Sequence, residues 1–275
     1  MLVCEVDPTG NLAAAFEAGP LHFEPREVQP SLWAMAMDTE SSLREYLSLH
    51  LKVPLLSRLG PLARALDFVA AAAPGVKEIL TVGKLAWEVR EGHYDLVVVD
   101  APATGHVVGQ LRAPDAIREL VHVGPVREQT AWMHEVLVDP ATTGVVIVAA
   151  PEEMPVTESL ELIERLADTH VDVAGIVVNR VLPELFGRGE EAIFERLCAP
   201  DAAAALATAV GGDPGPVLTA ARLAVTLRRT RAQHLARLRA GVDPTLPILF
   251  VPELFARAQG MRTISQIADR LGEEL

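Results

Sequence analysis

The sequence predicts an α/β protein built on a doubly wound, mostly parallel sheet flanked by helices. Five short apolar runs, rich in Val and Ile and without clean alternation, are typical of strands covered on both faces. Segments of helical length and spacing separate them, and we find no internal repeat or low-complexity linker. The expected strands are residues 2–6, 96–99, 145–150, 174–178 and 248–251.

A sixth run, Leu32 to Met37, places Trp33, Met35 and Met37 on one side and favours an edge strand. Helical spacing predicts helices between these strands. Their expected ranges are 41–51, 62–72, 76–90, 117–137, 157–167 and 217–240.

The helices after Met37 are not separated by a strand, so residues 39–92 are expected to form a helical insertion within a single domain spanning 1–275. Such an insertion either carries partner or substrate specificity or covers one face of the sheet, and both interpretations stay open.

Composition excludes several classes of protein. Half of the 275 residues are apolar, yet no run of eighteen lacks a charge or a break, which argues against a membrane span. The apolar start has no basic region ahead of it, so a secretory signal is not expected. Cys4 and Cys198 form no CxxC pair, which suits a reducing cytoplasm and excludes a cysteine zinc site.

The formal charge of −13 disfavours nucleic acid and anionic membranes as partners unless a local basic patch exists. One helical stretch concentrates arginines: Arg222, Arg228, Arg229, Arg231, Arg237 and Arg239. We interpret it as a solvated helix face balanced by acidic neighbours, with nucleic-acid binding as the alternative. We therefore expect no nucleic acid and no direct membrane insertion.

The run 96–99 is closed by Asp100. An acid at the carboxyl end of a buried parallel strand lies where open α/β sheets bind ligands, and in phosphate-loop enzymes it orients Mg²⁺. Pro102 and Gly105 then favour a loop of variable shape, in which Thr104 and His106 place polar groups beside the phosphates. Taken alone, Asp100 is equally typical of a turn or a helix cap.

The segment Asp100-Ala-Pro-Ala-Thr-Gly-His106, followed by Leu111-Arg-Ala-Pro114, resembles switch II, DxxPTGHxxxxLxxP, of the arsenite-stimulated ArsA ATPases and their relatives that target tail-anchored membrane proteins. Ala103 departs slightly from this pattern. The resemblance implies a P-loop NTPase fold, ATP and Mg²⁺ as cofactors, and a cytoplasmic homodimer with nucleotide at its interface. It also implies that Asp100 holds the metal and that Thr104 and Gly105 lie at the nucleotide.

A second segment, Val3-Cys-Glu-Val-Asp7-Pro8 running to Phe16, resembles switch I of the same family. By this match Asp7 is the catalytic carboxylate that orients or activates the attacking water. The alternative is that Asp7 only caps a helix starting near Gly10.

Two further strand ends resemble the adenine-contacting segments of the family. Asn179 closes one of them and would contact the base edge, and Pro252 opens the loop after the last strand and would pack on the ring. A smaller likeness is Pro74-Gly75-Val76-Lys77-Glu78, which resembles the PGxxE sequence that opens a helix in the family's helical region.

The phosphate loop that members of this family carry, GKGGVGKT, has no counterpart here, because no GxxxxGK[ST] occurs. That loop supplies the backbone N–H groups and the Lys that hold the phosphates. No Lys is near Asp7 or Asp100 in sequence. We expect the strand before the loop to be central, so that its loss exposes the edges of the strands ending at Asp7 and Asp100. A late start, a genuine pseudo-ATPase and a loop supplied by a partner chain all stay open.

The expected function is that of an ArsA-like ATPase, coupling ATP binding and hydrolysis to a client or anion-handling cycle and impaired here without the loop. The alternative is a non-catalytic nucleotide-binding or partner-recruiting protein. Two cysteines cannot build a three-thiolate arsenite site, and the Ala-rich insertion is unlike a groove for apolar client helices. The histidines lack zinc-enzyme spacing, and no GxSxG serine-hydrolase motif occurs.

Overall fold

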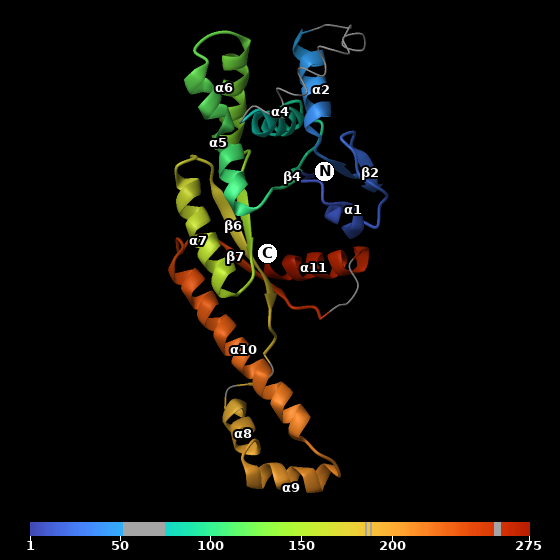
Figure 1. Ribbon diagram of the computed structural model, residues 1–275, viewed down its shortest axis with the longest axis vertical. Coiled ribbons are helices and arrows are strands. Elements are labelled where there is room, and N and C mark those ends of the chain that lie inside the picture. Colours follow the sequence, from blue (N-terminus) through green and yellow to red (C-terminus); the bar gives the residue numbers. More distant parts are fainter. Residues whose placement is uncertain (52–74, 185, 188, 256–259) are drawn as a thin grey trace. The chain divides into compact units, whose positions relative to one another are not determined.

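A computed structural model describes residues 1–51, 75–184, 186–187, 189–255 and 260–275 (Figure 1). These residues form two compact units. The first consists of Met1–Val145, Glu161–Ala174 and Ala256–Ala268, and the second of Val146–Leu160, Gly175–Phe255 and Asp269–Leu275. The α/β class with parallel strands flanked by helices is confirmed. The strands form two sheets where the sequence predicts one, and the single domain spanning 1–275 stays a prediction.

The first unit contains a four-stranded sheet in the order β2-β3-β1-β4. Strand β1 is parallel to both of its neighbours, and β2 runs antiparallel to β3. The predicted edge position of 32–37 is wrong, because β2 lies outside β3. Their bounds are Leu2–Glu5 for β1, Arg26–Gln29 for β2, Leu32–Ala36 for β3 and Val97–Asp100 for β4.

One apolar cluster of this unit lies on one face of the sheet. Leu2 and Cys4 of β1 pack with Met35 and Met37 and with Leu85 of helix α4, which spans Val76–Arg90 as predicted. Burying each large apolar side chain contributes about 1.5–3 kcal/mol, so these contacts fix α4 against the sheet.

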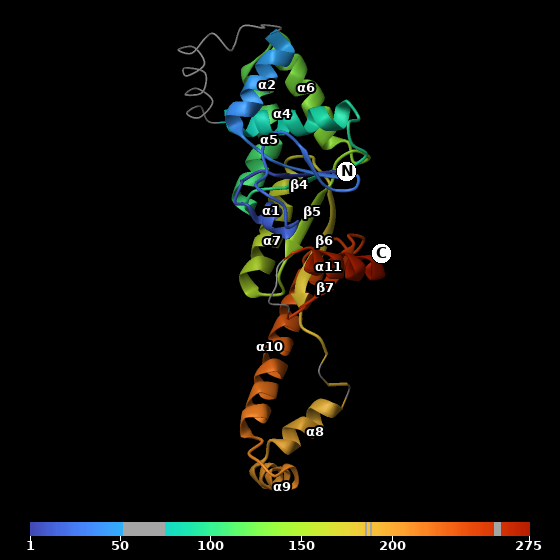
Figure 2. The same cartoon turned by 90° about the vertical axis from the view of Figure 1, so that its right-hand side faces the viewer.

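The other helices of the first unit are α1 (Asn11–Ala15), α2 (Thr39–Leu51), α5 (Thr104–Leu120) and α6 (Pro125–Val138). Helices α2, α4, α5 and α6 pack together (Figures 1 and 2). The single helix predicted for 117–137 is wrong, because Val121 is extended and Gly124 takes a φ of 94°. The helix predicted for 62–72 lies outside the described residues.

The second unit contains the sheet β5-β6-β7, in which β6 and β7 are parallel. The predicted strands are confirmed, and β6 is longer than expected. Helices α8, α9 and α11 were not expected, and α7 and α11 cross the boundary between the units. The bounds are Val145–Ala149 for β5, Glu153–Ala167 for α7, Val173–Val181 for β6, Glu190–Leu197 for α8, Pro200–Val210 for α9, Gly215–Ala240 for α10, Ile248–Pro252 for β7 and Met261–Glu274 for α11.

Three of the six arginines of α10, Arg228, Arg229 and Arg231, contact acids, as expected for a solvated helix face. Arg229 contacts Glu191 and Glu195, and Arg231 contacts Glu152. The structure therefore supports the balanced-face interpretation.

Each sheet has an outer strand with exposed apolar side chains. In the first unit, β1 pairs on both edges, so the expected exposed edge at the strand ending at Asp7 is wrong. Strand β4 is the end strand, and Leu96, Val98 and Val99 are 40–54% exposed.

Within the described residues, no helix is long and apolar enough to cross a membrane.

Candidate functional site

The parallel pairing of β1 and β4 places the two predicted carboxylates at one end of the first sheet. Glu5 is the register partner of Asp100, and the Val6 N–H donates to the Asp100 carbonyl at 3.2 Å. Asp7 follows β1 by two residues, and Asp100 is the last residue of β4. Both acids thus lie at the carboxyl ends of adjacent strands, where open α/β sheets bind ligands.

Glu5, which sequence reasoning did not select, is the buried acid of this sheet end, with 3% of its surface exposed. Its Oε1 accepts hydrogen bonds from the Thr9 hydroxyl at 3.1 Å and from the Asn11 N–H at 3.0 Å. The Leu12 N–H adds a longer contact of 3.5 Å. Glu5 therefore caps α1 from a distance and fixes the chain between β1 and that helix.

Asp7 does not cap α1. The N-cap residue is Gly10, with a φ of 82° and no side-chain capping hydrogen bond. The helix-cap interpretation of Asp7 is therefore wrong, since Glu5 performs that task. The φ of Gly10 lies in the left-handed region, which glycine reaches without strain.

Asp7 instead contacts a lysine of the helical insertion. Lys77, in the first turn of α4, places its Nζ 3.1 Å from Asp7 Oδ1. Both side chains are about half exposed, so the pair contributes at most about 1 kcal/mol to stability. No lysine is near Asp7 in sequence, and the fold brings Lys77 to it across 70 residues.

The negative charge of Asp100 is electrostatically unfavourable in this fold. Partial burial raises its pKa, and the neighbouring negative charge of Glu5 raises it further. A cation placed beside Asp100 would relieve both effects. The described residues contain no group of three or more His, Cys, Asp or Glu that could hold a metal. Mg²⁺ usually binds one or two carboxylates and takes its other ligands from phosphate and water, so Asp100 beside Glu5 fits that ion.

The predicted loop after Asp100 is shorter than expected. Helix α5 begins at Thr104, so Thr104, Gly105 and His106 form its first turn. The N-cap residue, Ala103, makes no side-chain capping bond. The first turn of a helix favours anions through its N–H groups and its dipole. Thr104 and Gly105 therefore lie where a phosphate would be stabilised.

Asn179 and Pro252 belong to the second unit. Strands β6 and β7 pair in parallel, with a register shift between Val178 and Val181 and a φ of 62° at Arg180. In this bulge Asn179 Oδ1 accepts the Arg180 N–H at 2.8 Å. Pro252 pairs with Val181 at the end of β6, whereas Asn179 lies in the bulge two residues before that end, with its oxygen engaged locally.

Comparison with known proteins agrees with this arrangement. The model of the ArsA ATPase family, described as anion-transporting ATPases, matches residues 1–125 and 120–189. The chain belongs to the ArsA ATPase family. It is 29% identical over 194 residues to the ATPase BagA of Mycobacterium tuberculosis, covering 66% of this chain and 57% of that protein. It is 24% identical over 220 residues to an ATPase ASNA1 homolog of Entamoeba dispar, covering 66% of this chain and 67% of that protein.

The chain thus spans a little over half the length of BagA.

Sequence reasoning missed two residues of this site, Glu5 and Lys77, and only Glu5 could have been found from the sequence. An acid inside the apolar run 2–6 is a signal for a buried partner, because carboxylates are rarely buried without one. Lys77 carries no such signal, since its contact depends on the tertiary fold.

Proposed function

We propose that this chain forms the switch portion of an ArsA-type ATPase, in which the sheet end around Asp7 and Asp100 acts on the γ-phosphate of ATP. The observation that carries the proposal is the in-register pairing of β1 and β4, which sets both acids at one sheet end beside the first turn of α5. Asp7 orients the attacking water, and Asp100 orients Mg²⁺. Thr104 and Gly105 contact the phosphates.

The adenine is assigned to the second unit. Pro252 would pack against the ring and Asn179 would contact the base edge. Because the Asn179 oxygen accepts the Arg180 N–H, its amide NH₂ is the group assigned to the base. By resemblance to the family, the protein acts as a cytoplasmic homodimer, and the helical insertion contacts the client or anion-handling partner.

The phosphate loop itself is assigned to residues outside this sequence, in the same or in another chain. The outer edge of β4 supports this assignment. The strand is the end of its sheet, it carries exposed Val98 and Val99 with exposed Leu96 just before it, and its other edge already pairs in parallel. A strand added there would satisfy the unpaired backbone groups and cover apolar surface. The loop after such a strand would lie at the sheet end that holds Asp100.

Calorimetry with MgATP tests this proposal. The chain as given is expected to bind MgATP weakly and to turn over little, and a version that also carries the family's strand–GKGGVGKT–helix segment is expected to bind tightly and hydrolyse ATP. Tight, Mg²⁺-dependent binding by the chain as given would contradict the assignment of the loop.

The role of Asp7 is tested in the loop-bearing protein. Asp7→Asn is expected to abolish hydrolysis while leaving ATP binding largely intact, because the amide cannot take a proton from water. Asp95→Asn is the matched control, since Asp95 is exposed and lies just before the amino end of β4. Retained turnover in Asp7→Asn would show that another group orients the water.

A further inference from the structure

A cavity lies among helices α2, α4, α5 and α6 of the first unit, and none of the residues assigned above to the nucleotide lines it. Its volume is about 210 Å³. An apolar cavity of about 150 Å³ suffices to bind benzene, so this one accepts a ligand of that size or somewhat larger. Its walls are mainly apolar, and they include Leu43, Ile79, Trp87, Ile117, Trp132 and Met133.

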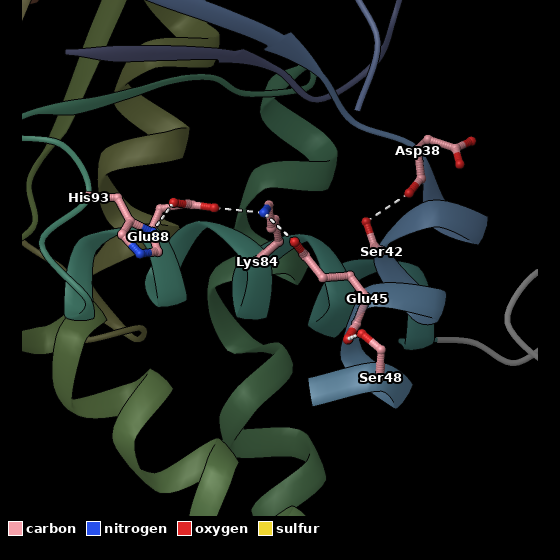
Figure 3. Close-up of polar contacts among 7 residues, drawn as sticks. All are labelled: Asp38, Ser42, Glu45, Ser48, Lys84, Glu88 and His93. Carbon is pink, nitrogen blue, oxygen red and sulfur yellow. Dashed lines mark hydrogen bonds and ion pairs between the residues drawn. The ribbon is translucent and has the colours of Figure 1, made fainter. Parts of the chain in front are cut away.

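The ammonium group at the wall already has two carboxylate partners. Lys84 contacts Glu45 Oε1 at 2.8 Å and Glu88 Oε1 at 2.6 Å (Figure 3). Its side chain is only 6% exposed. A ligand carboxylate or oxyanion would have to displace Glu45 to reach the ammonium group, so the cavity favours a neutral ligand.

Two hydroxyl groups of the lining also have partners within the protein. Ser42 Oγ donates to the Asp38 carbonyl at 2.7 Å, and Thr130 Oγ1 donates to the Val126 carbonyl at 3.0 Å. Gln129 differs. Its Oε1 atom is buried and, within the part of the chain that the structure describes, accepts no hydrogen bond. Buried acceptors are normally paired, and an orphan acceptor in a cavity wall indicates a donor supplied from outside.

We propose that this cavity binds a small neutral ligand with an apolar, ring-sized body and one O–H or N–H donor, which bonds to Gln129 Oε1. The apolar walls select the body, and the orphan oxygen selects the donor. The Lys84 network, one cation between two carboxylates, disfavours anionic ligands. The site is separate from the nucleotide chemistry, and its test contains no nucleotide.

A matched pair of probes tests the inference: 4-methylphenol, which has a donor, and toluene, which has the same ring without one. The chain has three tryptophans, of which Trp87 and Trp132 line the cavity and Trp33 lies on β3 as an internal control. In ¹H–¹⁵N spectra, we expect 4-methylphenol to shift the indole signals of Trp87 and Trp132 and to leave that of Trp33 in place. We expect it to bind roughly fivefold more tightly than toluene, the effect of one net hydrogen bond.

Two variants separate the hydrogen bond from the cavity. Gln129→Met keeps the length of the side chain and removes the acceptor, so both probes should bind it equally. Val126→Phe enlarges a side chain that is 42% exposed at the cavity wall and should weaken both probes alike. Equal affinity of the two probes for the unmodified protein, or no shift of either cavity tryptophan, would overturn the proposal. If Gln129→Met fails to fold, the probe pair on the unmodified protein still decides.

Discussion

Replacing Lys84 with Met should destabilise the first unit strongly. In the native protein its ammonium group lies between Glu45 and Glu88, and Glu88 is only 7% exposed. Burial alone would lower the pKa of Lys84, but its hydrogen bonds to the two carboxylates raise it overall, so the lysine is charged. Removing one partner of such a buried pair leaves an uncompensated charge and costs about 3–5 kcal/mol. Urea unfolding followed by tryptophan fluorescence measures this loss.

Two controls make the test specific. Arg44→Met breaks an exposed pair with Glu40 on α2, with side chains 61% and 48% exposed, and should cost less than about 1 kcal/mol. The double variant Lys84→Met with Glu88→Leu removes both buried charges and should recover most of the loss. A Lys84→Met loss no larger than that of Arg44→Met would refute the reasoning.

Three further predictions concern the sheet. Burial raises the pKa of the Cys4 thiol from 9.0 to about 12, so ionisation favours the unfolded chain. Above pH 9 the Cys4 thiol should therefore lower stability, by about 4 kcal/mol at most, and Cys4→Ala should remove this contribution in urea titrations. Asp100→Asn should stabilise the protein at pH 7, because the raised pKa of Asp100 means that its negative charge is unfavourable in the folded state. Below the usual pKa of 3.8 the carboxyl is neutral in both states, so no gain in stability is expected there. A gain that persists at such a pH would contradict this cause. Lys77→Met should change stability by less than about 1 kcal/mol. It should nevertheless lower the kcat of the loop-bearing ATPase at unchanged KM, and Lys77→Arg should restore that kcat. An unchanged kcat would show that the contact with Asp7 is incidental.

Much of the sheet could be predicted from the sequence, because short runs of Val and Ile without alternation are typical of strands buried on both faces. The strand that was missed, β2, shows why the rest could not. Arg26–Gln29 is short and polar, with three of its four residues exposed, so it carries no apolar signal. It is held by pairing with β3, and that pairing moves 32–36 from the expected edge to the interior.

Some helices were predicted wrongly for a different reason. The break between α5 and α6 depends on four residues, 121–124, which an apolar pattern spans without interruption. Gly124, with its φ of 94°, and Pro125, at the first position of α6, mark it in the sequence. Helix α11, by contrast, has Met261, Ile264, Ile267 and Leu271 at helical spacing, so its signal was present in the sequence and was not used.

The candidate site follows the same division. Asp7 and Asp100 could be predicted because each follows an apolar strand within a motif, and local sequence determines both. The tasks of Glu5 and Lys77 depend on which segments meet in the fold. The cap on α1 illustrates this: sequence proximity favoured Asp7, whereas the structure gives the task to Glu5, whose side chain reaches the N–H groups of Asn11 and Leu12.

Helix α4 supports one of the two alternatives that the sequence left open for the insertion, the covering of a sheet face. Its Leu85 packs on the sheet core, so the helix covers a face of the sheet. Lys77 and Lys84 are seven residues apart, which is about two turns and places them on one side of the helix, roughly 10 Å apart. Lys77 contacts Asp7, and Lys84 lines the cavity. Helix α4 therefore covers a face of the sheet through Leu85 and also brings Lys77 to Asp7.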